Sequence, residues 1–373
     1  MTEPGLRRTP LYDRHLQLGA RIVGLGGFEI PVQYAGVLRE HEAVRKRAGL
    51  FDLSHMGQIR LRGDAVGPWA DELSANHVAT MKPGAARYNL FCNEQGGTHD
   101  DVIFYREGEL EWLLVVNASN AAKMWDLICE RARAGVEMEN QHGNRALIAI
   151  QGPASIGVLA PLVTERDRAR VEAMRYYSCA RATICAIDVL IARTGYTGED
   201  GFEIFADNEA APLLWDALLE SGAPDGLEPC GLGARDVLRL EAGMPLYGHE
   251  LEENITPLQA GLDWAVKFDK PAFTGKCALE AQRAKGGYPR IAGFILEGRA
   301  PPARSGYRVL LEGRDVGEVR SGAPAPSVGN QSIGTALVEA AAAKAGVRLA
   351  IEIRGTPWPA TVAEMPFYKR AKR

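Results

Sequence analysis

The stretch Gly298-Arg-Ala-Pro-Pro-Ala-Arg-Ser-Gly306 separates two parts of this chain that differ in pattern. Its prolines and glycines interrupt regular secondary structure. After it, apolar and polar residues alternate in Tyr307-Arg-Val-Leu-Leu311, Gly317-Glu-Val-Arg320 and Val347-Arg-Leu-Ala-Ile-Glu-Ile353, as they do in half-buried antiparallel strands. We therefore predict a large mixed region of helices and strands, followed by a small antiparallel barrel or sandwich.

The region before this break mixes helical and strand patterns without a repeat of fixed length. We expect helices that open at Thr9-Pro-Leu-Tyr12 and cover 37–48, 120–134 and 210–220. We expect strands at 58–61, 86–91, 102–105, 112–116, 146–150, 183–192 and 202–205.

Size and composition indicate a globular protein of two or three domains. The 373 residues are 46% apolar and 24% charged, which leaves ample material for a core. A net charge of -4 argues against a nucleic-acid-binding protein, which usually presents a basic face. No apolar run approaches the ~20 residues that a membrane span needs. We expect the basic runs Arg45-Lys-Arg47 and Lys369-Arg-Ala-Lys-Arg373 to be solvated surface.

Several kinds of site and compartment are disfavoured. The six cysteines form no Cys-x-x-Cys pair, and no signal-peptide pattern follows Met1, so we expect a protein of the reducing cytoplasm. The seven histidines lack metal-ligand spacing, so we expect no metal. Phosphate-loop and nucleophile-elbow motifs are also missing from the sequence.

Three glycine-rich segments carry charged or aromatic residues that an ordinary core does not need. They are Arg193-Thr-Gly-Tyr-Thr-Gly-Glu-Asp-Gly-Phe-Glu203, Gly231-Leu-Gly-Ala-Arg-Asp236 and Gly96-Gly-Thr-His-Asp-Asp101. Glycines let the backbone approach a ligand closely. We predict that these segments assemble a site for a flat, polar small molecule.

The pair Asp100 and Asp101 heads a predicted strand. Successive side chains of a strand point to opposite faces, so Asp101, Ile103 and Tyr105 share one face. The two carboxylates therefore diverge and do not form a proton-sharing dyad. One of them is expected to face a pocket, while a role in capping the preceding turn remains open for either.

Glu203, Tyr196 and Arg235 are further candidates. Glu203 should lie opposite the core-facing Phe202 and Ile204, where its carboxylate suits the paired N–H groups of an amino-pyrimidinone; the alternative is an exposed strand glutamate. Tyr196 offers a ring between Gly195 and Gly198, or it merely packs. Arg235 opens a predicted helix over 234–242, against the helix dipole, so it either holds a ligand carboxylate or pairs with Asp236.

With these segments in place, the chain resembles the glycine cleavage T-protein family of folate-dependent aminomethyltransferases from about Thr9 to Tyr368. The shared signatures, in order, are Thr9-Pro-Leu-Tyr12, Pro31-Val-Gln-Tyr34, Phe51-Asp-Leu-Ser-His-Met-Gly57, Asn93-Glu-Gln-Gly-Gly97 with Asp100-Asp101, Gln151-Gly-Pro153, the two stretches that begin at Arg193 and Gly231, Leu246-Tyr-Gly248 and Met365-Pro-Phe-Tyr368.

The resemblance implies an α+β fold, a three-domain cloverleaf around a central folate pocket. It implies a folate-binding domain from 1–50 and 143–280, a ferredoxin-like domain over 51–142 and a β barrel over 281–373. The implied reaction transfers the methylene of aminomethyldihydrolipoyl, carried by the lipoylated H-protein, to tetrahydrofolate with release of ammonia. Tetrahydrofolate is then the one-carbon acceptor.

The resemblance also assigns residues. Asp101 matches the catalytic aspartate, Glu203 the residue that reads the pterin edge, and Arg235 a folate contact. The expected pocket further contains Tyr88, Ile103, Tyr105, Asn117, Tyr196, Trp264 and Tyr368. Docking of an acidic H-protein is expected to use basic residues such as Arg21, Arg87 or Lys267.

Two departures from the family pattern keep alternatives open. Thr98-His99 stands where relatives usually carry two aliphatic residues, and Phe28 replaces an early tryptophan. A folate-dependent demethylase acting on another small methyl donor is one alternative. A folate-binding accessory protein for RNA modification is another, although Gly275-Lys-Cys-Ala-Leu279 holds only a fragment of that group's Lys-Gly-Cys-Tyr-x-Gly-Gln segment.

Overall fold

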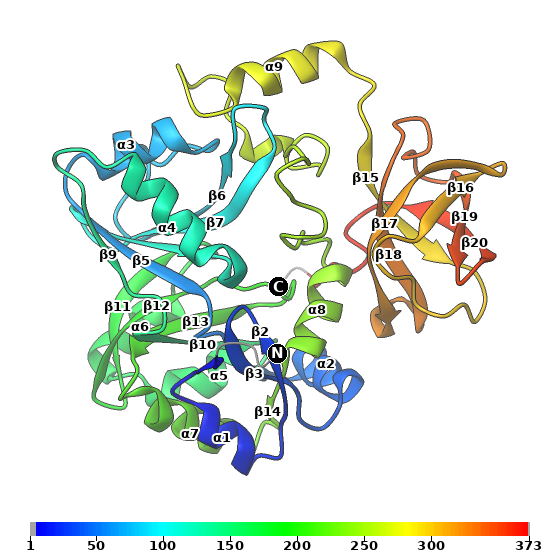
Figure 1. Cartoon of the computed structure of the whole chain (residues 1–373). Helices are drawn as coiled ribbons and strands as arrows, with labels where there is room; N and C mark the ends of the chain where they lie inside the picture. Colours follow the sequence, from blue (N-terminus) through cyan, green and yellow to red (C-terminus); the bar gives the residue numbers. More distant parts are fainter. Residues whose placement is uncertain (1–4, 372–373) are drawn as a thin grey trace. The chain divides into compact units, whose positions relative to one another are not determined.

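A computed structural model describes residues 5–371 (Figure 1). These residues divide into two compact units. The first unit holds the described residues up to Ala70, together with Val78–Tyr88 and Val102–Asp236. The second holds Asp71–His77, Asn89–Asp101 and the described residues from Val237 onward. The three domain ranges expected from the resemblance stay a prediction.

A six-stranded sheet forms the centre of the first unit. Its order is β11 (Cys179–Ile184), β12 (Ile187–Ala192), β13 (Gly201–Asp207), β10 (Arg145–Gln151), β4 (Gly49–Asp52) and β14 (Glu228–Pro229). The helices α5 (Ser155–Leu159) and α7 (Ala211–Gly222) pack their apolar residues onto one face, where Phe202 and Ile204 of β13 join the core. Because side chains alternate along a strand, Glu203 lies on the other face, as predicted.

A five-stranded sheet contains the strand that carries Asp101. Its order is β6 (Ala85–Cys92), β7 (Thr98–Arg106), β8 (Glu111–Val116), β5 (Gly57–Arg62) and β9 (Glu137–Asn140). Burial along β7 alternates from Thr98 to Phe104, with Asp100 fully buried and Asp101 half-buried. The predicted divergence of the two carboxylates is therefore confirmed.

The remaining elements of the first unit surround these sheets. They are the three-stranded sheet β1 (Arg7–Arg8), β3 (Phe28–Gln33) and β2 (Arg21–Leu25), and the helices α1 (Tyr12–Gln17), α2 (Val37–Lys46), α3 (Val66–Leu73, whose last residues belong to the second unit), α4 (Ala121–Glu130) and α6 (Glu165–Glu172), with short 3-10 turns at Ala118–Asn120 and Ala160–Leu162.

The second unit contains a closed six-stranded barrel, visible as β15 to β20 in Figure 1. Its order is β15 (Arg290–Leu296), β18 (Gln331–Val338), β17 (Arg314–Ala325), β16 (Arg308–Leu311), β19 (Arg348–Ile353) and β20 (Thr356–Ala363). Apolar residues from the strands fill it, among them Phe294, Val319 and Ile351. The unit also holds α9 (Lys276–Lys285) and 3-10 turns at Asp263–Ala265 and Pro326–Val328.

Three expectations need correction. The proline-rich break at 298–306 lies inside the barrel, because β15 precedes it and pairs with β18 and β20. The helix expected over 120–134 ends at Glu130, before a turn that reaches Gly135. The helix expected over 234–242 is α8 (Leu232–Glu241) and starts earlier, because the Glu40 carboxylate accepts a hydrogen bond from the Gly231 amide (2.8 Å).

Candidate functional site

Glu203 is the centre of a buried hydrogen-bonded cluster in the first unit. Glu203 is only 7% exposed, so the alternative interpretation, an exposed strand glutamate, is wrong. The Tyr105 hydroxyl donates to Glu203 Oε2 (3.0 Å), and the Thr194 hydroxyl donates to the same oxygen. Burial, and then the charge of Glu203, raise the pKa of Tyr105 well above its ordinary value, so the phenol remains a donor.

The glycine-rich turn beside Glu203 is held by groups from distant parts of the first unit. The Gln151 amide donates to the Thr194 carbonyl (3.1 Å) and accepts from the Thr197 hydroxyl (3.0 Å). It lies so close to Gly195 that an added Cβ would come within 1.9 Å of its oxygen. A side chain at position 195 would therefore displace the turn that presents Tyr196.

A buried ion pair fixes the far end of this turn. Arg45 of α2 donates to the Glu199 carboxylate (2.9 Å) and to the Thr197 carbonyl (2.7 Å). The side chains of Arg45 and Glu199 are only 7% and 5% exposed, so the expectation that Arg45 is solvated surface is wrong. Removing either partner would leave the other charge buried and unpaired.

Arg235 lies in the first turn of α8 with a donor that no described residue satisfies. Its guanidinium carbon lies 4.7 Å from the centre of the Tyr196 ring. Its Nη1 is buried and has no hydrogen-bond partner among residues 5–371. Burial lowers the pKa of Arg235, and the opposing charges of Glu203, Tyr196 and Tyr105 raise it, which places these four groups in one electrostatic cluster. The geometry therefore favours a ligand acceptor over the alternative pair with the exposed Asp236.

Two features set where Arg235 lies. Glu40, fully buried, accepts from the amides of Tyr34 (2.6 Å) and Gly36 (3.0 Å) as well as Gly231. An added Cβ at Gly231 would come within 2.3 Å of the Val32 backbone. The start of α8 can approach β3 this closely only because glycine stands there.

His55 is a member of this region that the sequence reasoning did not single out. It lies three residues after the end of β4, is 5% exposed, and its Nδ1 has no hydrogen-bond partner among the described residues. Burial lowers the pKa of His55 to about 4; Asp52 opposes this shift, while Arg235 and His142 contribute to it. The imidazole is therefore neutral at pH 7 and can accept or donate one hydrogen bond. A histidine three residues after a buried strand was the available signal.

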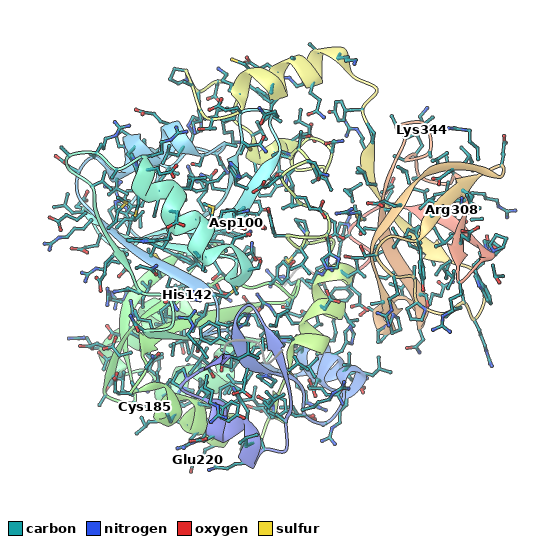
Figure 2. All side chains as sticks on the ribbon, in the orientation of Figure 1. Asp100, His142, Cys185, Glu220, Arg308 and Lys344 are labelled. Carbon is teal, nitrogen blue, oxygen red and sulfur yellow. The ribbon has the colours of Figure 1, made fainter. Side chains whose placement is uncertain are left out.

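Asp101 belongs to the second unit, at the start of β7. The turn before it is capped by Asn93, whose side-chain oxygen accepts from the amides of Gln95 (3.0 Å) and Gly97 (2.9 Å). Fully buried Asp100 and half-buried Asp101 point to opposite faces of the strand. Figure 2 labels Asp100 on this strand.

The other predicted pocket residues divide between the units. Tyr88, Ile103 and Asn117 are half-buried in the first unit, which also contains Tyr105, Tyr196, Glu203 and Arg235. Trp264 and Tyr368 belong to the second unit. Trp264 is 58% exposed, and the Tyr368 amide donates to the Glu241 carbonyl (2.8 Å). The structure thus brings Tyr105, Tyr196, Glu203 and Arg235 together; the shared site with Asp101 stays a prediction.

Family models cover nearly the whole chain. The model of the GCVT N-terminal domain matches residues 11–270, and the model of the glycine cleavage T-protein C-terminal barrel domain matches residues 290–369. The chain belongs to the glycine cleavage T-protein family.

Individual members of this family match this chain over nearly its full length. The chain is 45% identical to an aminomethyltransferase of Geobacillus thermodenitrificans (strain NG80-2) over 98% of this chain and 100% of the relative. It is 46% identical to an aminomethyltransferase of Streptomyces coelicolor (strain ATCC BAA-471 / A3(2) / M145) over 100% of both chains. The crystal structure of glycine cleavage system aminomethyltransferase T from Bartonella henselae superposes with a TM-score of 0.89, at 33% identity and 98% coverage of both chains.

The T-protein family is folate-dependent, and the residues of the first unit fit such a ligand. A pterin offers adjacent N–H donors, for which the buried Glu203 carboxylate is an acceptor. Folate also carries carbonyl and carboxylate oxygens, which would satisfy the unpartnered Nη1 of Arg235. The fit rests on these two observations.

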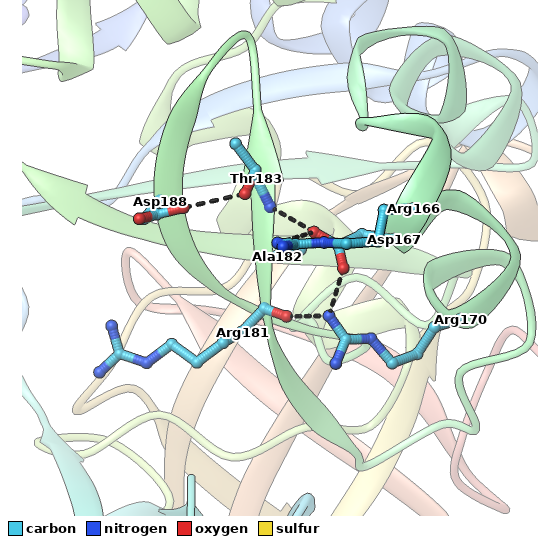
Figure 3. Close-up of a pocket in the computed structure, with 7 residues that line it drawn as sticks. All are labelled: Arg166, Asp167, Arg170, Arg181, Ala182, Thr183 and Asp188. Carbon is cyan, nitrogen blue, oxygen red and sulfur yellow. Dashed lines mark hydrogen bonds and ion pairs between the residues drawn. The ribbon is translucent and has the colours of Figure 1, made fainter.

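A separate hollow of about 620 Å³ in this T-protein family member does not involve the predicted site residues (Figure 3). It is lined by Arg166, Asp167, Arg170, Arg181, Ala182, Thr183 and Asp188. Asp167 accepts from the Arg170 guanidinium (2.8 Å) and from the Thr183 amide (3.0 Å), so its charge is already compensated. None of the nine residues assigned to folate lines this hollow.

Proposed function

We propose that this chain is the aminomethyltransferase of the glycine cleavage system. It transfers the methylene of H-protein-bound S-aminomethyldihydrolipoyl to tetrahydrofolate and releases ammonia. The observation that carries the ligand assignment is the buried Nη1 of Arg235, which has no partner among the described residues and interacts electrostatically with the buried Glu203 carboxylate. No described helix is long and apolar enough to cross a membrane.

Tetrahydrofolate supplies the two nitrogens that accept the methylene. The carbon leaves sulfur and the amine, and the two folate N–H hydrogens end on the dihydrolipoyl thiol and on ammonia. Glu203 would hold the pterin edge, with the Tyr105 and Thr194 hydroxyls fixing its carboxylate. Arg235 would bind a folate oxygen, and the ring of Tyr196 would keep the guanidinium in place.

Asp101 is the proposed catalytic residue. Its carboxylate would orient the folate nitrogens and take up a proton as the new carbon–nitrogen bond forms. Tyr88, Ile103, Asn117, Trp264 and Tyr368 are proposed to complete the folate pocket.

The lipoylated H-protein is the proposed carrier. The basic residues proposed to meet it are Arg21, which is exposed, Arg87, which donates to the Thr80 hydroxyl (3.0 Å), and Lys267, which donates to the Trp264 carbonyl (2.8 Å). The compartment is proposed to be the cytoplasm.

The decisive experiment compares wild type with Asp101→Asn. We expect methylene-tetrahydrofolate formation from aminomethylated H-protein to fall by ~100-fold or more, since proton transfer contributes about that much, while the Kd for tetrahydrofolate changes less than about threefold. Asp188→Asn, at an exposed position, is the matched control. An active Asp101→Asn enzyme would remove Asp101 from the reaction.

A different one-carbon donor remains the second candidate, because Thr98-His99, close to Asp101, departs from the family pattern. If wild type binds tetrahydrofolate but leaves aminomethylated H-protein unchanged, the methyl donor is a different small molecule. Formation of methyl-tetrahydrofolate from methylamines or methyl ethers, with release of the demethylated amine or alcohol, would then identify a folate-dependent demethylase.

A further inference from the structure

Within the second unit, the 246–255 loop holds the first residue of β7 through three hydrogen bonds. The Thr98 amide donates to the carbonyls of Glu252 (2.9 Å) and Ile255 (3.1 Å). The Thr98 hydroxyl donates to the Ile255 carbonyl (3.0 Å). Thr98 is fully buried, so water does not compete for these bonds.

Residues on both sides of Thr98 contact the same loop. The Asn93 side chain donates to the Glu253 carbonyl (2.8 Å). An added Cβ at Gly97 would lie 1.8 Å from that carbonyl, so only glycine fits. His99 Nδ1 lies 3.3 Å from the Glu253 carboxylate. The loop and the start of β7 are therefore closely fitted over several consecutive residues.

The other side of the loop is anchored to the barrel. His249 Nδ1 lies 2.7 Å from the Arg320 carbonyl, and the Arg320 guanidinium donates back to the His249 carbonyl (2.6 Å). The Glu250 carboxylate accepts from Arg239 of α8 (2.9 Å) and from the Thr335 hydroxyl. Arg320 also pairs with Glu252. These buried contacts tie the loop to strands β17 and β18.

A shift at Thr98 would be passed to Asp101, because the two lie three positions apart on one extended strand, a distance of about 10 Å. Misplacement of a reacting group by about 1 Å can reduce a rate by ~100-fold. We propose that the 246–255 loop positions the Asp101 carboxylate for methylene transfer, and that the Thr98 hydroxyl is the positioning group. This inference rests on the proposed function.

The test compares Thr98→Val with Thr98→Ser in the full-length protein. Valine keeps the shape and removes the hydroxyl, whereas serine restores it. We expect kcat with aminomethylated H-protein to fall about tenfold in Thr98→Val, with KM for tetrahydrofolate unchanged within about twofold, and to recover in Thr98→Ser. Should Thr98→Val fail to fold, Thr98→Ala takes its place.

Ser332→Ala is the matched control, because the Ser332 hydroxyl also donates to a carbonyl, that of Ala300, over 3.0 Å in a buried part of the same unit. Its kcat should equal that of wild type. If Thr98→Val keeps its kcat, or if Thr98→Ser is as slow as Thr98→Val, the hydroxyl does not position Asp101 and the inference is wrong.

A second readout separates this inference from the proposed function. Wild type that does not turn over aminomethylated H-protein contradicts the function alone. Hydrogen exchange then tests the positioning role without a one-carbon donor. The backbone amides of Asp100 and Asp101 should exchange about tenfold faster in Thr98→Val than in Thr98→Ser. Equal exchange in the two variants would overturn it.

Discussion

Arg235, half-buried with a buried Nη1, and Arg45, whose side chain is 7% exposed, are two arginines of the first unit whose surroundings differ in one respect. Arg45 is paired with Glu199, whereas Arg235 Nη1 has no partner among the described residues. A buried donor without a partner costs about 1–3 kcal/mol, and this cost is recovered when a ligand supplies the acceptor. The ion pair gives Arg45 a structural role, whereas the unpartnered donor of Arg235 is consistent with its proposed role as a ligand contact.

Replacing each arginine with methionine should therefore have opposite effects. For Arg235→Met we expect an unfolding free energy in the ligand-free protein that is unchanged or up to ~1 kcal/mol higher, and tetrahydrofolate affinity at least about tenfold weaker. For Arg45→Met we expect a loss of about 3 kcal/mol, because Glu199 stays buried and unpaired. Urea unfolding and fluorescence titration measure both. A destabilised Arg235→Met with normal affinity would make Arg235 structural.

Among the elements, β4 and the residues after it concentrate buried polar groups. The Asp52 carboxylate accepts from the Thr9 hydroxyl (2.6 Å) and contacts His15 Nε2 (2.8 Å), and the Ser54 amide donates to it (2.9 Å). Burial raises the pKa of Asp52, but these hydrogen bonds outweigh it and hold the pKa below its ordinary value. Asp52 therefore remains charged even at acidic pH, whereas His55, three residues later, is buried in its neutral form.

His55 should make stability depend on pH between about 4 and 6.5. Its pKa is about 4 in the folded protein and ~6.5 when unfolded, so the unfolded chain binds the extra proton and stability falls as the pH is lowered through this window. The full difference is about 3 kcal/mol. Urea unfolding of wild type and His55→Gln at pH 7.5 and pH 4.5 measures it, and the variant should lose most of the slope. Asp52 contributes only below this window, since its folded pKa is lowered.

Periodicity along single elements predicted much of this architecture. The alternation in β7 correctly placed Asp100 and Asp101 on opposite faces, and that in β13 correctly set Glu203 apart from Phe202 and Ile204. The predictions that failed concern elements whose positions are set by contacts with residues far away in the sequence. The start of α8 is set by Glu40, 191 residues before Gly231, and the first barrel strand precedes the proline-rich break because it closes against β18 and β20.

For the candidate site, residue types were predictable but their surroundings were not. A buried Glu203 requires the Tyr105 and Thr194 hydroxyls, which come from 98 and 9 residues away in the chain. The unpartnered donor of Arg235 and the neutral His55 are properties of burial, which one sequence without a structure does not report. Family resemblance supplied the residue roles, and the structure supplied the reasons for some of them.

At the scale of the whole molecule, folate binding should be visible as a shift in thermal unfolding. A ligand that binds only the folded state at 100 times its Kd adds ~2.7 kcal/mol to the unfolding free energy. With an unfolding entropy of about 2.1 cal/mol/K per residue over 373 residues, this corresponds to roughly 3 °C in Tm. We expect this rise with tetrahydrofolate in wild type.

The same measurement on variants separates binding from catalysis. Asp101→Asn should keep most of this rise at the wild-type ligand concentration, because the proposed role of Asp101 lies in the transfer step and its Kd is expected to change less than about threefold. Arg235→Met should show at most about half of this rise at the wild-type ligand concentration, because a tenfold weaker Kd leaves only ~1.4 kcal/mol of stabilisation. Differential scanning calorimetry with and without tetrahydrofolate measures all three. If Arg235→Met keeps the full rise while Asp101→Asn loses it, the proposed roles of these two residues are exchanged, and Asp101 becomes the principal folate contact.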